Sequence, residues 1–107
     1  MMYPKINTMR GTLNGNPNIT WEYSEFQDTL YIRLSQDFDA TFYDEIDSSP
    51  GVFLRYTLDD EQRFVGITVE QIARRLNASH PDAPALGALA SDLVAQFAPP
   101  DPSHGQS

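Results

Sequence analysis

The sequence has no cysteine and only two histidines among its 107 residues. The absence of cysteine excludes disulfide bonds, thiolate metal ligands and cysteine nucleophiles. His80 lies in a Ser-His-Pro linker and His104 lies near the C-terminal end, so neither is on an element that would hold an imidazole in one orientation. A nucleophile–base triad is therefore not expected. The composition favours a protein that is not an enzyme, and we expect neither a metal nor a cofactor.

Basic residues and long apolar runs are also scarce. Seven lysines and arginines against fifteen aspartates and glutamates give a net charge of −8, which repels the phosphates of nucleic acids. Such a protein is attracted instead to basic partners. No apolar run approaches the roughly 20 residues that cross a bilayer, and the first residues lack the pattern of a signal peptide. We therefore expect a cytoplasmic protein that binds neither nucleic acid nor membranes.

The length fits one domain, and the two ends of the chain differ from its middle. Residues 1–18 are polar and weakly patterned, with a turn at Asn14-Gly15-Asn16-Pro17 and room for a short edge strand before it. Residues 98–107 are rich in proline and small polar residues, which is typical of a disordered tail. The sequence therefore predicts a single α+β domain over residues 19–97.

Alternating apolar and polar residues predict the strands of this domain. Asp44 falls on the apolar side of its strand, which is typical of an edge strand or a strand end. A hairpin across the acidic turn matches Tyr56 with Val65, Leu54 with Ile67 and Val52 with Val69, so apolar residues meet in a single register. The strands are expected over residues 19–23, 28–34, 40–46, 52–58 and 65–69.

Two helices are predicted after the last strand. Thr68 and Gln71 have the spacing of a capping box, so the first helix should begin near Val69. Asp82 can cap a second helix with an apolar stripe that runs to Phe97. Successive hairpins with short connections favour an antiparallel sheet, and its apolar face requires cover. The expected fold is α+β, an antiparallel β-meander of four to five strands with two C-terminal helices packed on one face.

The sheet face turned away from the helices has a composition that suggests a function. Interleaved arginines and aromatic rings are enriched at protein interfaces, although scattered surface aromatics are also common. Cover by the N-terminal segment and a platform for single-stranded nucleic acid are further alternatives, and the net charge opposes the second. The candidate partner or dimer surface consists of Tyr31, Arg33, Phe53, Arg55 and Phe64.

Acidic residues between 37 and 47 offer a rival site, which would bind a metal or small ligand or act in catalysis. The candidates are Asp37, Asp39, Asp44, Glu45 and Asp47. A calcium loop needs a turn glycine and a distal glutamate at fixed positions, and the residues after Asp39 do not supply them. Ordinary solvated acids are therefore the favoured interpretation of this segment.

A pattern in the middle half of the chain extends this interpretation. It consists of Tyr23 followed by Asp28-Thr29-Leu30-Tyr31-Ile32-Arg33-Leu34, then Gly51-Val52-Phe53-Leu54 with Tyr56, Asp59-Asp60-Glu61 and Val65-Gly66-Ile67. This pattern resembles the small bacterial proteins known as domain of unknown function 2283. Arg55, Gln62 and Thr68 depart from the family pattern, and the usual family ending does not include the helix expected over 82–97.

The resemblance implies no catalytic residues. Similar proteins are often encoded beside small basic toxin-like ribonucleases, so the resemblance implies an antitoxin-like role. Together with the residue-based arguments, this predicts a small non-enzymatic protein-binding or regulatory module that forms a homodimer and can bind a basic protein. The alternative is a small-ligand or metal-binding protein, or an enzyme, that uses the acids near 37–47.

Overall fold

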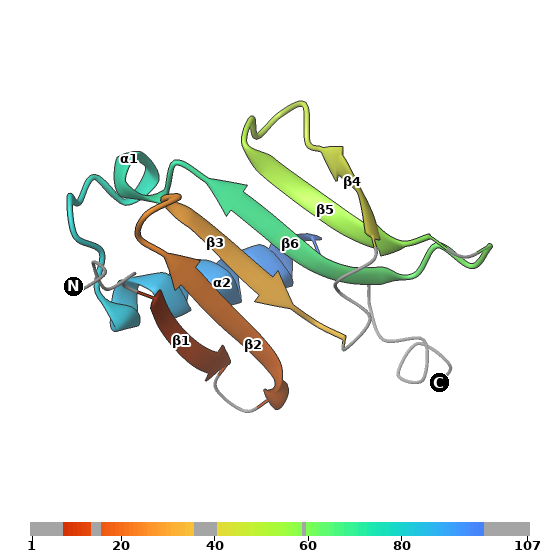
Figure 1. Cartoon of the computed structure of the whole chain (residues 1–107), viewed down its shortest axis with the longest axis horizontal. Helices are drawn as coiled ribbons and strands as arrows, with labels where there is room; N and C mark the ends of the chain where they lie inside the picture. The colour runs from red at the N-terminus through yellow and green to blue at the C-terminus, as the bar shows by residue number, and fades with distance from the viewer. Residues whose placement is uncertain (1–7, 14–15, 36–40, 59, 98–107) are drawn as a thin grey trace, which may run out of the picture.

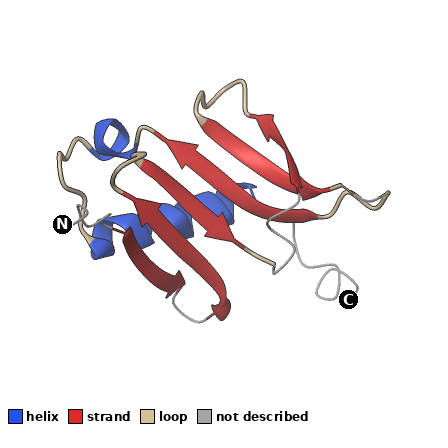
Figure 2. Ribbon diagram, in the orientation of Figure 1, coloured by secondary structure: helices blue, strands red, loops and turns tan. Residues whose placement is uncertain are grey.

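A computed structural model of the protein describes residues 8–13, 16–35, 41–58 and 60–97. Within these residues, six strands form one antiparallel sheet and two helices follow it in the chain (Figures 1 and 2). The α+β class and the C-terminal helices are thus confirmed, whereas the expected four to five strands are too few, because an N-terminal edge strand is added. The elements are β1 (Thr8–Leu13), β2 (Asn16–Ser24), β3 (Thr29–Arg33), β4 (Thr41–Glu45), β5 (Val52–Thr57), β6 (Phe64–Glu70), α1 (Ile72–Leu76) and α2 (Ala83–Phe97).

The order of the strands differs from a simple meander. It is β1-β2-β3-β6-β5-β4, so β3 pairs with β6 and not with β4. Two three-stranded meanders are joined through their third strands. The two central strands carry fully buried residues such as Ile32 and Ile67, whereas β4 exposes Tyr43, Asp44 and Glu45. The most apolar strands therefore take the centre and the charged strand takes an edge, as Asp44 predicts.

One face of the sheet is apolar and is covered by α2, which lies behind the sheet in Figure 1. Leu86, Ala90 and Leu93 are the buried residues of this helix. They belong to one core cluster with strand residues that alternate onto the same face. Asp82 accepts a hydrogen bond from the Ala85 amide at 2.9 Å, which confirms it as the cap of α2. No described helix is long and apolar enough to cross a membrane.

Trp21 fills the space between β1 and α2. A Cβ atom added to Gly11 would lie 2.6 Å from the indole ring, and one added to Gly87 would lie 3.6 Å from it. The first distance is shorter than van der Waals contact and the second is an ordinary contact. The indole therefore packs directly on the backbone of β1, whereas the helix side retains room for a methyl group.

Asp28 caps α1 from the turn between β2 and β3. Its carboxylate accepts a hydrogen bond from the Ala73 amide at 3.0 Å, and its carbonyl accepts one from the Ile72 amide at 3.2 Å. The predicted capping box is wrong, because Thr68 belongs to β6 and Gln71 has φ 60° and makes no side-chain cap. β6 continues through Glu70, so α1 begins at Ile72 and not near Val69.

The buried Tyr23 hydroxyl extends this network by donating a hydrogen bond to Asp28 Oδ1 at 2.6 Å. Tyr23 is 1 % exposed, and burial, followed by the hydrogen bond to Asp28, raises the pKa of this phenol well above its ordinary value. Tyr23 and Asp28 thus join the first hairpin to the start of α1. Both belong to the sequence pattern described above, so that part of the pattern has a structural explanation.

The raised pKa of Tyr23 predicts a loss of stability in alkali. An unfolded tyrosine releases its proton near pH 10, whereas the folded phenol retains it, so stability is full below pH 10 and falls as the pH rises above it. We expect the wild type to lose up to about 1.4 kcal/mol more per pH unit in this range than Tyr23→Phe. Urea unfolding followed by Trp21 fluorescence would measure both slopes, and equal slopes would contradict the prediction.

Candidate functional site

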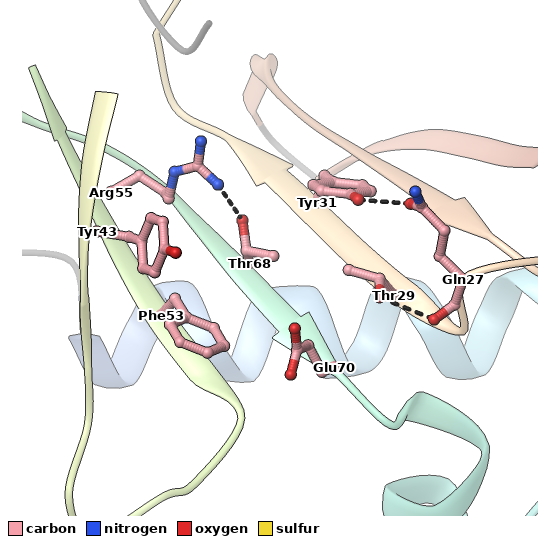
Figure 3. A pocket seen from close by; sticks show the side chains of 8 residues that line it. All are labelled: Gln27, Thr29, Tyr31, Tyr43, Phe53, Arg55, Thr68 and Glu70. Carbon is pink, nitrogen blue, oxygen red and sulfur yellow. Dashed lines mark hydrogen bonds between the residues drawn. The ribbon is translucent and has the colours of Figure 1, made fainter. Parts of the chain in front are cut away.

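The face of the sheet opposite α2 carries an open cavity of about 540 Å³ above strands β3, β6, β5 and β4. This volume lies within the range of small-ligand pockets, although the cavity is open rather than enclosed. Figure 3 shows its side chains projecting from one face of the ribbon. The lining residues are Gln27, Thr29, Tyr31, Tyr43, Phe53, Arg55, Thr68 and Glu70.

Arg55 is held in place by hydroxyl groups on both neighbouring strands. Its Nε donates to Thr41 Oγ1 at 2.8 Å, and its Nη1 donates to Thr68 Oγ1 at 3.1 Å. The guanidinium carbon also lies 5.5 Å from the centre of the Tyr43 ring, within the range of a cation–π contact. These contacts fix a positive charge over β4, β5 and β6.

Aromatic rings form the other walls of the cavity. Tyr43 and Phe53 meet edge to face, with ring centres 5.2 Å apart and an angle of 89°. Across the cavity, the Tyr31 hydroxyl donates to Gln27 Oε1 at 2.6 Å, and the Thr29 hydroxyl donates to the Gln27 carbonyl at 3.0 Å. The cavity thus combines rigid rings with a fixed cation and several hydroxyl groups, a combination suited to binding.

Three of the five residues predicted for the partner surface meet in this cavity, namely Tyr31, Phe53 and Arg55. Arg33 lies on the same face in a neighbouring depression over β1, β2 and β3. There it shares the surface with Arg10 and Glu22, whose side chains form an ion pair at 3.7 Å.

Phe64 does not join this surface, which corrects the expectation that it faces away from the helices. It packs against the core, with its ring centre 5.8 Å from that of Tyr56. The cause is a bulge: Arg55 pairs with Gly66, whereas Tyr56 pairs with Phe64 and not with Val65 as predicted. The extra residue turns Phe64 to the same side as Tyr56. The other predicted pairs of this hairpin, Val52 with Val69 and Leu54 with Ile67, are confirmed.

Tyr43 and Glu70 are part of the cavity but were not among the predicted surface residues. The alternation along β4 could have indicated Tyr43, because a strand with Phe42 and Asp44 on one face places Tyr43 on the other. Glu70 gave no such signal, because it was expected within the first helix. Its position depends on β6 extending to residue 70.

The rival acidic site is only partly within the described residues, since Asp37 and Asp39 lie outside them. Asp44 pairs with Leu54 and Glu45 pairs with Phe53, so these two neighbours point to opposite faces of the sheet. Glu45 accepts a hydrogen bond from the Gly51 amide at 2.9 Å. Among the described residues, no group of three or more histidines, cysteines or acids is placed to hold a metal ion.

Comparison with known proteins gives one match. Residues 21–72 match the model of a family described as "Protein of unknown function (DUF2283)". The matched segment contains β3, β4, β5 and β6 and all eight residues that line the cavity. No curated protein and no solved structure matches the chain.

Proposed function

We propose, from this geometry and from the match of residues 21–72 to the DUF2283 family model, that the chain is a small non-enzymatic module that binds protein through the cavity-bearing face of its sheet. We call this surface the open face. It comprises the strand side chains that alternate away from α2, with Tyr31, Tyr43, Phe53 and Arg55 at its centre.

The observation that carries this proposal is the clustering of three rings and a fixed arginine on a face that no described helix covers (Figures 1 and 3). Aromatic residues and arginine are enriched where proteins bind one another. Tyr43 is 61 % exposed although it contacts both Phe53 and Arg55. A pre-formed cluster of this kind loses little side-chain entropy when a partner covers it.

Two kinds of partner fit the proposal. A second copy of the chain would make it a homodimer, and a basic protein would be attracted by the net charge of −8. The antitoxin-like role that the family resemblance implies is the most specific form of the second case, with a basic toxin-like ribonuclease as partner. Both forms assume a cytoplasmic protein that binds neither nucleic acid nor a membrane.

Replacing Phe53 by serine tests the proposed surface. We expect Phe53→Ser to abolish self-association or the retention of a partner, because the variant removes the ring against which Tyr43 packs. Size-exclusion chromatography with light scattering measures self-association and partner retention. The protein is purified with and without co-expression of the neighbouring genes. Phe26→Ser is the matched control, because Phe26 is 86 % exposed in the β2–β3 turn, outside the open face.

The result is interpretable only if the variant folds, so circular dichroism and Trp21 fluorescence should show a native signal for both variants. A wild-type chain that is strictly monomeric and retains no partner would remove the support for the proposal. A partner that stays bound to Phe53→Ser as tightly as to the wild type would place the binding surface elsewhere.

The cavity supports one alternative function, the binding of a small molecule between Arg55 and Glu70. Its volume of about 540 Å³ favours this alternative. A thermal-shift screen with divalent cations and small metabolites distinguishes the two functions, because a ligand that binds the folded state raises the melting temperature.

A further inference from the structure

The open face differs in charge from the rest of the chain. Among the described strand residues that alternate onto it, three are arginines and three are glutamates: Arg10, Arg33, Arg55, Glu22, Glu45 and Glu70. This face is therefore neutral, although the whole chain carries a charge of −8. A strongly basic partner gains little from a neutral surface, whereas two copies of the chain repel one another least there.

Arg55 and Glu70, the two charged residues of the cavity, lie on opposite sides of a central row of residues. Tyr31 and Phe53 both pair with Thr68, so these residues form one row across three strands. Arg55 lies two residues along β5 on one side of this row, opposite Gly66. Glu70 lies two residues along β6 on the other side of it. The positive and negative groups are thus equally far from a central row that carries two rings.

We propose that two copies of the chain pack open face to open face about a two-fold axis over this central row, with Arg55 of each copy paired with Glu70 of the other. This inference rests on the proposed function and names the partner. This axis lies midway between the two sheets and runs along the row, perpendicular to the strands. Rotation about it brings the Arg55 side of the row in one copy over the Glu70 side of the row in the other. Viewed along the normal to the sheets, Arg55 of one copy then lies about one strand spacing, roughly 5 Å, to the side of Glu70 of the other, and both side chains extend into the gap of roughly 10 Å between the stacked sheets.

The same axis brings the rings of the central row together. Phe53 and Tyr31 of one copy lie over the corresponding rings of the other, and Tyr43 adds its exposed ring beside them. A two-fold interface uses the same patch on both subunits, so this patch must complement itself. The Arg55–Glu70 pair meets that requirement twice in each dimer, at the margin of an aromatic centre.

Charge reversal tests the pairing. We expect Arg55→Glu and Glu70→Arg each to raise the dissociation constant of the dimer about tenfold or more, because each variant places like charges opposite one another. The double variant Arg55→Glu/Glu70→Arg should restore the dimer. Sedimentation equilibrium or light scattering over a concentration series measures all four proteins. Asp92→Arg on the exposed side of α2 is the control, because it changes the net charge as Glu70→Arg does but lies behind the sheet.

Arg55→Glu also removes the hydrogen bonds to Thr41 and Thr68, so Glu70→Arg is the cleaner single variant. A dimer that neither reversal weakens, or that the double variant fails to restore, would overturn the pairing. A wild type that is monomeric at every concentration would overturn the second-copy proposal. The proposed function would then still stand or fall by whether Phe53→Ser releases a different partner.

Discussion

Asp28→Ala should lower the free energy of unfolding by about 3 kcal/mol, because two separate contacts are lost. Removing a helix cap costs about 1 kcal/mol, and leaving the buried Tyr23 hydroxyl without its acceptor costs about 1–3 kcal/mol. Both contacts converge on the same carboxylate, with Oδ1 2.6 Å from the Tyr23 hydroxyl and 3.0 Å from the Ala73 amide. Urea unfolding followed by the fluorescence of the single tryptophan measures the change.

Asp28→Asn is the matched control for this prediction. Asp28 has φ 51°, a left-handed conformation that asparagine adopts readily and alanine does not. The asparagine side-chain oxygen can also accept both hydrogen bonds, so most of the stability should remain. An equal loss in the two variants would show that the negative charge, and not the hydrogen-bond acceptor, is what matters.

Gly11→Ala and Gly87→Ala should change stability in opposite directions, although both place a methyl group against Trp21. At Gly11 the new Cβ would lie 2.6 Å from a ring that is only 4 % exposed. The ring or the edge strand must shift, which should cost about 2 kcal/mol. At Gly87 the contact is 3.6 Å and needs no shift, so the higher helix propensity of alanine should stabilise α2 by up to about 1 kcal/mol.

Chemical unfolding of the two variants beside the wild type tests both signs, and near-ultraviolet circular dichroism of Trp21 reports where the indole is displaced. A stable Gly11→Ala variant with an unchanged tryptophan signal would show that β1 does not pack on the indole as described. A destabilised Gly87→Ala variant would show that α2 lies closer to the ring than the 3.6 Å contact indicates.

The behaviour of Phe64 and Glu70 shows why the open face could be predicted only in part. Strict alternation places Phe64 with Tyr31 and Phe53, but one bulge in the β5–β6 pair moves it to the core side. Glu70 is the reverse case, because it was expected in a helix but lies in a strand on the open face. Its spacing from Thr68 is compatible with the first turn of a helix. The pairing of Thr29 with Glu70, together with the hydrogen bond from the Glu70 amide to the Gly51 carbonyl at 2.9 Å, keeps it in a strand on the open face.

The start of α1 gives a third case. The spacing of Thr68 and Gln71 is a local signal for a cap, yet the actual cap is Asp28, 45 positions away from Ala73. The sequence pattern contains Tyr23 and Asp28 but no hint that they contact each other and this helix. Sheet pairing holds Thr68 in β6, which continues through Glu70, so a distant carboxylate caps the helix in place of the local side chain.

The sequence alone determined the features that depend on near neighbours: the approximate positions of β2 to β6, the cap and stripe of α2, the edge character of β4 and the two matched pairs of the β5–β6 hairpin. Alternation and helical spacing encode these, because burial of one face repeats with the period of the element. Only the tertiary structure decided that β3 pairs with β6, that Asp28 caps α1, and that Tyr43 and Glu70 join Arg55 in one cavity. Each of these depends on contacts between segments that are far apart in the sequence. The local periodicity of apolar residues carries no information about such contacts.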